Sequence, residues 1–115
     1  MGPGRGTGLK RGEIYWVDFD PIRGGEIGKR RPAVVVSNDT ACAIQNRLQV
    51  VPITTNTRRV HSWEAPVEVR GLPCKALADQ IRTVAKERVL DFVGEVTVRE
   101  LRGIERAIKL QLGLI

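Results

Sequence analysis

The feature that most constrains this fold is a change of periodicity near residue 97. Before it, segments with a strand-like pattern are separated by Gly, Asn and Pro turns. The segment 33–37 is a continuous apolar run, as in a strand buried on both sides, and Pro52 suggests an edge or a bulge in the next one. Short strands at this spacing favour a small barrel. We expect them at residues 13–19, 33–37, 48–54, 63–69 and 75–84, the last one bent.

The C-terminal part has the pattern of one amphipathic helix. Thr97 and Glu100 form a capping box, in which a hydroxyl and a carboxylate each accept from an otherwise unpaired backbone N–H. A shorter helical turn is expected at residues 86–88. The fold class is therefore mainly β, with a bent antiparallel sheet closed by a C-terminal α-helix. The apolar residues that should form its inward stripe are Val98, Leu101, Ile104 or Ala107, Ile108 and Leu112.

The length of 115 residues suits one domain, because two would each bury too small a core. We expect residues 10–115 to form it and residues 1–9, which are rich in glycine, to be a disordered tail. The first ten residues lack the apolar region of a secretory signal, and no run approaches the roughly 18 apolar residues of a membrane span. These features predict a cytoplasmic protein without a membrane partner.

The net charge of +6 points to a polyanionic partner, although such a charge can also serve solubility alone. Nucleic acid, an acidic membrane surface and an acidic protein all fit. Cys42 and Cys74 lack the paired spacing of a zinc site, and we expect both thiols to be reduced. No metal or other cofactor is expected.

Five ordered blocks of sequence, spread from about residue 10 to residue 114, resemble the MazF/PemK family of mRNA interferase toxins. The resemblance implies an SH3-like barrel that forms a homodimer and cleaves single-stranded mRNA at specific sequences, leaving 2′,3′-cyclic phosphate and 5′-hydroxyl ends. It also implies a cognate antitoxin with an acidic tail that occupies the RNA groove. The blocks are 11–21 (RGEIYWVDFDP) with Gly25-Glu26, 31–36 (RPAVVV), 37–39 (SND), 51–54 (VPIT) and 78–83 (ADQIRT).

RNA supplies its own nucleophile, the 2′-hydroxyl, so an enzyme needs only to move protons and stabilise charge on the phosphate. A two-histidine mechanism is excluded, because His61 is the chain's single histidine and has the surroundings of an ordinary loop residue. Arg31 is the best catalytic candidate: its guanidinium can clamp two phosphate oxygens, and Pro32 holds it extended. The resemblance adds Thr54 as a donor to the phosphate. Glu26 could be a base or a substrate contact.

The remaining predicted RNA-binding residues are mostly basic. One branch of the family, the Kid-like toxins, uses an arginine and an aspartate on the later strand, but Leu77 stands at that arginine's place and Gly25 at the place of an early histidine. Asp79 is therefore expected to contact RNA or to be structural, and Arg82 to bind phosphate or to pair with Asp79. The full set is Lys29, Arg30, Arg58, Arg59, Asp79, Gln80 and Arg82.

The two tryptophans differ in their setting. Trp16 lies in a core-like strand and is expected to pack, whereas Trp63, next to a basic loop, could equally pack or stack on a base. Two other functions fit the same fold: a non-catalytic gyrase poison of the CcdB type, and a nucleic-acid-binding barrel without activity. Cleavage of purified single-stranded RNA separates the first prediction from both.

Overall fold

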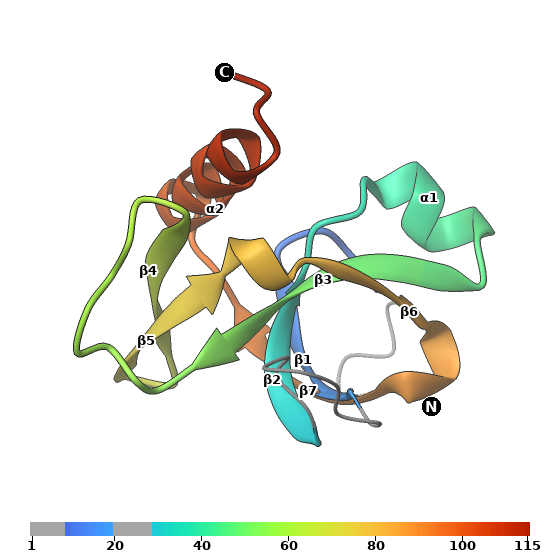
Figure 1. The fold of residues 1–115 in the computed structure, drawn as a ribbon. Helices are drawn as coiled ribbons and strands as arrows, with labels where there is room; N and C mark the ends of the chain where they lie inside the picture. Colours follow the sequence, from blue (N-terminus) through green and yellow to red (C-terminus); the bar gives the residue numbers. More distant parts are fainter. Residues whose placement is uncertain (1–8, 20–28) are drawn as a thin grey trace.

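The computed structural model describes residues 9–19 and 29–115, which form one curled antiparallel sheet and two α-helices (Figure 1). The helices are α1 (Asp39–Ile44) and α2 (Val98–Gln111), and two 3-10 turns are η1 (Ala78–Gln80) and η2 (Lys86–Arg88). The strands are β1 (Glu13–Asp18), β2 (Arg30–Val35), β3 (Arg47–Thr54), β4 (Glu64–Val69), β5 (Leu72–Leu77), β6 (Arg82–Ala85) and β7 (Val89–Glu95).

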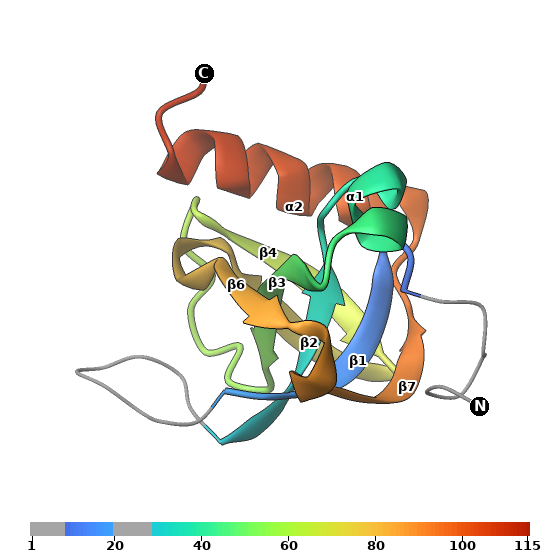
Figure 2. The same ribbon diagram turned by 90° about the vertical axis from the view of Figure 1, so that its right-hand side faces the viewer.

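The strands follow the order β4-β5-β3-β2-β1-β7, and β6 pairs with β3 beside that path. Early and late parts of the chain therefore meet in the sheet, because β1 pairs with β7 from Glu13↔Glu95 to Val17↔Val89. The sheet curls into a half-barrel, and α2 lies across one of its faces (Figure 2). The predicted class, mainly β with a C-terminal helix, is confirmed.

Two hydrophobic cores lie on opposite faces of the central strands. The helix-side core lies beneath α2, with Ile104 and Ala107 packed on Ile14, Val34 and Ile53 among others. Successive residues of a strand point to opposite faces of the sheet. The strand residues that alternate with those of the helix-side core therefore form a second core on the opposite face. We call that the far-side core, and it includes Tyr15, Val17, Phe19, Ala33, Val35, Leu48 and Val50. The prediction that residues 33–37 are buried on both sides is confirmed.

Helix α2 begins at the predicted capping box. The Glu100 N–H donates to the Thr97 hydroxyl at 3.0 Å, and the Thr97 N–H donates to Glu100 Oε1 at 2.9 Å. The predicted stripe is buried in the middle of the helix. Val98 and Leu112 are exposed, contrary to the prediction, because the stripe's two ends are not covered by the sheet.

Pro52 suggested an edge or a bulge, and the edge is wrong, because β3 has partners on both sides. On one side Pro52 lies opposite Ala33 of β2. On the other side β3 pairs with β6 up to Val50↔Arg82 and with β5 from Ile53↔Ala76. A residue without an N–H is tolerated there, since Pro52 falls between the last residue paired with β6 and the first paired with β5.

Several local features differ from the sequence pattern. The expected strand 75–84 is two strands, β5 and β6, separated by η1, whereas the helical turn at 86–88 is confirmed as η2. Neither β7 nor α1 was expected; α1 is a single short segment whose Ala41 N–H donates to the Asn38 side chain at 2.8 Å. Trp16 is 39% exposed rather than packed. It shares a face with Ile14 but lies two residues farther along β1, outside the helix-side core.

Candidate active site and nucleic-acid interface

The candidate site lies where β1 ends and β2 begins. The Phe19 N–H donates to the Lys29 carbonyl at 2.8 Å, and Arg30 pairs with Asp18, so the two strands are held together up to this point. Lys29 has a left-handed φ of 59°, which costs a residue with a side chain about 1–2 kcal/mol. Lys29 and Arg30 are exposed, as expected of residues that attract RNA.

Arg31 lies at the rim of the far-side core. It pairs with Val17 and shares a strand face with Ala33 and Val35, both fully buried. Its own side chain is exposed. The strand therefore holds Arg31 beside buried neighbours near the start of β2, with its side chain exposed to solvent.

Thr54 is the last residue of β3, the strand that lies next to β2 in the sheet. The ladder between β2 and β3 ends at Ala33↔Pro52. Arg31 and Thr54 each lie two residues beyond this last pair, and there Thr54 pairs with Lys75 of β5. The half-buried Thr54 hydroxyl accepts from the Asn56 N–H at 3.2 Å. A hydroxyl that accepts still has its hydrogen to donate, which suits a phosphate oxygen.

A small hollow of about 160 Å³ on this side of the molecule adds two arginines to the site. Arg82 lies opposite Val50, and its guanidinium carbon is 5.2 Å from the centroid of the Phe19 ring, a cation–π contact. Arg88 donates from Nη1 to the Asp18 carbonyl at 3.3 Å. Arg82 was predicted as an RNA contact, whereas Arg88 was missed, although its place in the predicted turn at 86–88 could have indicated it.

Asp79 and Gln80 lie on η1, which contacts α2, β3 and β4. Asp79 is exposed and Gln80 half-buried. Their turn follows β5, whereas Arg82 begins β6 and faces the far-side core. The structure therefore assigns Asp79 to the helix-side part of the sheet, which is consistent with a structural or RNA-contacting role.

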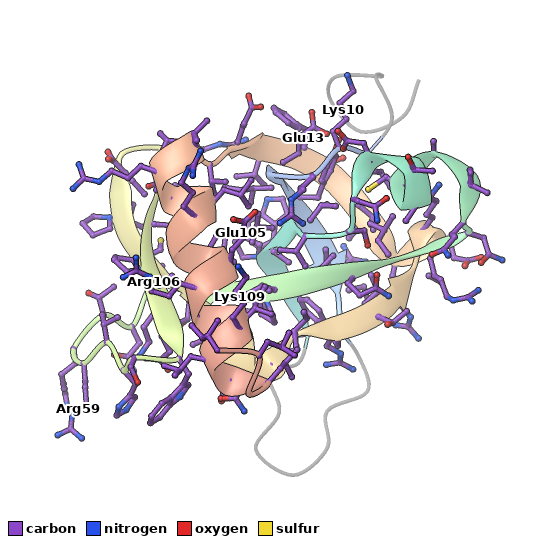
Figure 3. All side chains as sticks on the ribbon, turned by 90° about the horizontal axis from the view of Figure 1, so that it is seen from above. Lys10, Glu13, Arg59, Glu105, Arg106 and Lys109 are labelled. Atoms are coloured by element: carbon purple, nitrogen blue, oxygen red, sulfur yellow. The ribbon has the colours of Figure 1, made fainter. Side chains whose placement is uncertain are left out.

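Arg58 and Arg59 lie on the connection between β3 and β4, and both are exposed. Figure 3 shows the Arg59 side chain at the outer edge of the molecule, pointing away from the sheet. Farther along this connection His61 stacks on Trp63, with ring centroids 4.5 Å apart and an interplanar angle of 3°. The connection thus combines positive charge with exposed aromatic surface.

A buried ion pair fixes this connection to β5. Lys75 Nζ lies 3.0 Å from Glu64 Oε1, with side-chain exposures of 11% and 8%. Lys75 also donates to the Arg59 carbonyl at 2.6 Å, and the His61 N–H donates to Glu64 Oε1 at 2.9 Å. Burial alone would raise the pKa of Glu64, but the His61 amide and the Lys75 ammonium outweigh it and hold that pKa below its ordinary value.

Sequence reasoning missed both members of this pair. A signal existed, because Lys75 interrupts an apolar stretch between Cys74 and Ala76, and a lysine is rarely buried without a partner. Glu64 begins β4 next to Trp63. The two charges lie on consecutive strands, and the pairing of β4 with β5 brings them together.

Other predicted features lie elsewhere. Glu26 falls outside the described residues. Among residues 9–19 and 29–115, no group of three or more His, Cys, Asp or Glu could hold a metal ion. Cys42 and Cys74 are free and buried, and burial raises the pKa of each thiol. No helix in the described part of the chain is long and apolar enough to span a membrane.

Comparison with known proteins identifies a consistent set of relatives. Residues 10–112 match the family described as PemK-like, MazF-like toxin of type II toxin-antitoxin system. The chain is 45% identical over 115 residues to endoribonuclease MazF9 of Mycobacterium tuberculosis, covering 92% of this chain and 98% of that protein.

Solved structures agree with this result. MazF from Deinococcus radiodurans superposes with a TM-score of 0.82 at 25% sequence identity, covering 92% of this chain and 97% of that one. An endoribonuclease from a mycobacterial species, in complex with its cognate antitoxin, superposes with a TM-score of 0.78 at 27% identity, covering 92% and 96% of the two chains.

Proposed function

Because the chain belongs to the PemK-like, MazF-like toxin family of type II toxin–antitoxin systems, we propose that it cleaves single-stranded mRNA by attack of the substrate's own 2′-hydroxyl. The family resemblance inferred from the sequence blocks is confirmed. The chain is an endoribonuclease toxin, like its relatives that bear that name. A gyrase poison or an inactive binding barrel would not account for those relatives.

The reaction forms a bond between the 2′-oxygen and phosphorus and breaks the bond from phosphorus to the 5′-oxygen. A base takes the 2′-hydroxyl proton, and the leaving 5′-oxygen receives a proton. The products are a 2′,3′-cyclic phosphate and a 5′-hydroxyl. Between these events negative charge increases on the phosphate oxygens, and stabilising that charge is the main task left to the protein.

The observation that supports this proposal is that Arg31 and Thr54 lie near the ends of the neighbouring strands β2 and β3, each two residues beyond the last pair of their ladder, Ala33↔Pro52. A guanidinium fork and a hydroxyl there suit the non-bridging oxygens of one phosphate. Glu26 is proposed as the base or as a contact to the substrate. Arg82, on the same face of the sheet as Arg31, suits a neighbouring phosphate of the strand.

Partners follow from the same family. An antitoxin is the expected protein partner, since solved relatives include toxin–antitoxin complexes. We propose further that the antitoxin binds through an acidic tail, which would compete with RNA for the basic surface around Arg58 and Arg59. We also propose that two copies form a homodimer with the RNA lying across it. The predicted cytoplasmic location fits this role.

The experiment that tests the proposal is cleavage of a long purified RNA in EDTA, with both ends of each product mapped. We expect cuts at one short sequence, cyclic phosphate on the upstream fragments and 5′-hydroxyl on the downstream ones. Arg31→Ala serves as the control for a contaminating nuclease. Cleavage that stops in EDTA and returns with Mg²⁺, or products with 5′-phosphate, would contradict the mechanism.

A further inference from the structure

We propose that the His61–Trp63 ring stack is a binding site for one unpaired nucleobase, and that the buried Glu64–Lys75 pair positions it. The choice of RNA as ligand rests on the proposed function. The geometry of the site stands independently of the cleavage step, because the stack lies on the β3–β4 connection and not among Arg31, Thr54 and Arg82.

The stack is assembled before any ligand binds. The rings are nearly parallel, at 3°, with their centroids 4.5 Å apart. Trp63 is nevertheless 37% exposed and His61 half-buried, so the pair still presents ring surface to solvent. Adding a base to an existing stack extends it by one ring without reorganisation of the protein. Every base offers a π-face, so such a site accepts single-stranded nucleic acid of any sequence.

The surrounding charge favours the same ligand. Arg58 and Arg59 lie three and two residues before His61 in the sequence, and both are exposed. Arginines next to an aromatic platform bind the phosphates that flank a stacked base. A base inside a duplex already has stacking neighbours on both sides, and this selects for an unpaired strand.

The Glu64–Lys75 pair fixes the backbone next to the His61–Trp63 stack. The Lys75 ammonium donates to the Arg59 carbonyl, and the Glu64 carboxylate accepts from the His61 N–H. The Arg59 carbonyl and the His61 N–H, on either side of Val60, are therefore both held by one ion pair. This pair is largely buried, with 3.0 Å between Lys75 Nζ and Glu64 Oε1. Glu64 and Lys75 are positioning residues, since they act on the RNA only through this connection.

The test uses a strand that cannot be cut. Trp16→Phe leaves Trp63 as the single tryptophan, and the probe is a 2′-O-methyl oligoadenylate of about ten nucleotides, which lacks the nucleophilic hydroxyl. We expect the probe to quench Trp63 fluorescence in a saturable way. An abasic strand with the same number of phosphates should bind by charge without quenching. Equal quenching by both strands would overturn the proposal.

Substitutions then separate stacking from folding. Trp63→Leu should weaken binding of oligoadenylate by roughly 5- to 150-fold, the effect of one lost base–aromatic stack, and leave binding of the abasic strand unchanged. Trp63→Phe should restore part of the loss. Oligoadenylate affinity unchanged in Trp63→Leu would also overturn the site. Because the probe is not a substrate, a failure of RNA cleavage would leave these results intact.

The positioning role has its own readout. Replacing both charges, in Glu64→Gln with Lys75→Met, avoids leaving one buried charge unpaired and should keep the melting temperature near that of the parent. Discrimination between oligoadenylate and the abasic strand should nevertheless decrease, because the connection loses the Lys75 hydrogen bond to the Arg59 carbonyl. A folded double variant with unchanged discrimination would show that the pair does not position the stack.

Discussion

Thr54 and Lys75 lie directly opposite each other on β3 and β5. The residue proposed to bind the scissile phosphate thus shares a cross-strand position with the lysine that holds the β3–β4 connection. Chemistry and RNA contact are therefore built on one pair of strands, and changes at one position are expected to affect the other.

Arg31 is proposed to act on the transition state, whereas its basic neighbours are proposed to attract RNA. Arg31→Ala should lower kcat by on the order of 100- to 1000-fold with a much smaller loss of RNA affinity, since the phosphate charge it meets is greatest in the transition state. Lysine should rescue poorly, because a point charge cannot span two oxygens. Single-turnover cleavage, RNA affinity and thermal melting measure the three quantities.

Arg30→Ala is the matched control. It removes the same charge from the adjacent residue, whose side chain points to the opposite face of β2, and it should reduce affinity more than kcat. If Arg31→Ala cleaves within about threefold of the wild type, Arg31 is merely a basic surface residue. Arg82, which lies beside Phe19, and Asp79 on η1 would then be tested next, each by its own substitution.

The nucleophile is tested on the substrate. Replacing the 2′-hydroxyl of the scissile nucleotide by hydrogen should abolish cleavage at that position and leave binding within a few-fold, because only the attacking atom is lost. The same replacement one nucleotide downstream is the control and should permit cleavage. A cut in the strand with the scissile deoxynucleotide would show that water, not the RNA, attacks.

Arg58 should act through charge alone. Arg58→Ala should reduce the slope of log affinity against log salt by about 0.7, the value for one phosphate contact on a single strand. Arg47→Ala is the control, since Arg47 is also exposed but lies at the opposite end of β3. Affinity titrations at several salt concentrations give both slopes. Equal slopes for Arg58→Ala and the wild type would place this connection away from the RNA.

Breaking the Glu64–Lys75 pair should lower the free energy of unfolding. Lys75→Ala leaves a buried carboxylate unpaired and should cost about 3–5 kcal/mol. Glu105→Gln breaks the partly exposed pair between Arg11 and Glu105, with side-chain exposures of 30% and 37%, and should cost no more than about 1 kcal/mol. Denaturant unfolding measures both values. A Lys75→Ala cost as small as that of Glu105→Gln would show that the buried pair adds little.

The same pair predicts an acid-sensitive contribution. The pKa of Glu64 is lower in the folded chain than its ordinary value of 4.5, so the unfolded chain binds more protons under acidic conditions. The stabilisation is complete above that value and is lost as the pH falls toward the lower, folded pKa. The melting temperature of the wild type should therefore drop more steeply below about pH 4.5 than that of Glu64→Gln. Parallel curves for the two proteins would contradict this.

Local patterns predicted most of the fold. The capping box at Thr97 and the apolar run at 33–37 each specify their element through contacts within a few residues. Strand β7 escaped notice because its pairing with β1 shifts register twice, near Ile14 and Tyr15, which breaks the alternation that marks a strand. Pro52 was misjudged for a related reason: whether a strand is central depends on its partners, which only the assembled sheet shows.

The candidate site was predicted unevenly. Arg31 lies at the predicted place before Pro32, and Thr54 was proposed only through the family resemblance; the catalytic role of both stays a prediction. The Arg82 contact with Phe19 joins residues far apart in the chain. The pair of Glu64 with Lys75 forms across the β4–β5 hairpin. Such contacts depend on sheet register and curvature, so the sequence showed the charges without their partners.

The pairing of β1 with β7 has a consequence for how the protein is made. A ribosome releases Arg31 and Thr54 early, but the last strand to join β1 ends at Glu95. Until then β1 lacks one neighbour, and the sheet that aims the arginine is incomplete. A growing chain should therefore be unable to cut RNA until β7 has been made and has paired with β1.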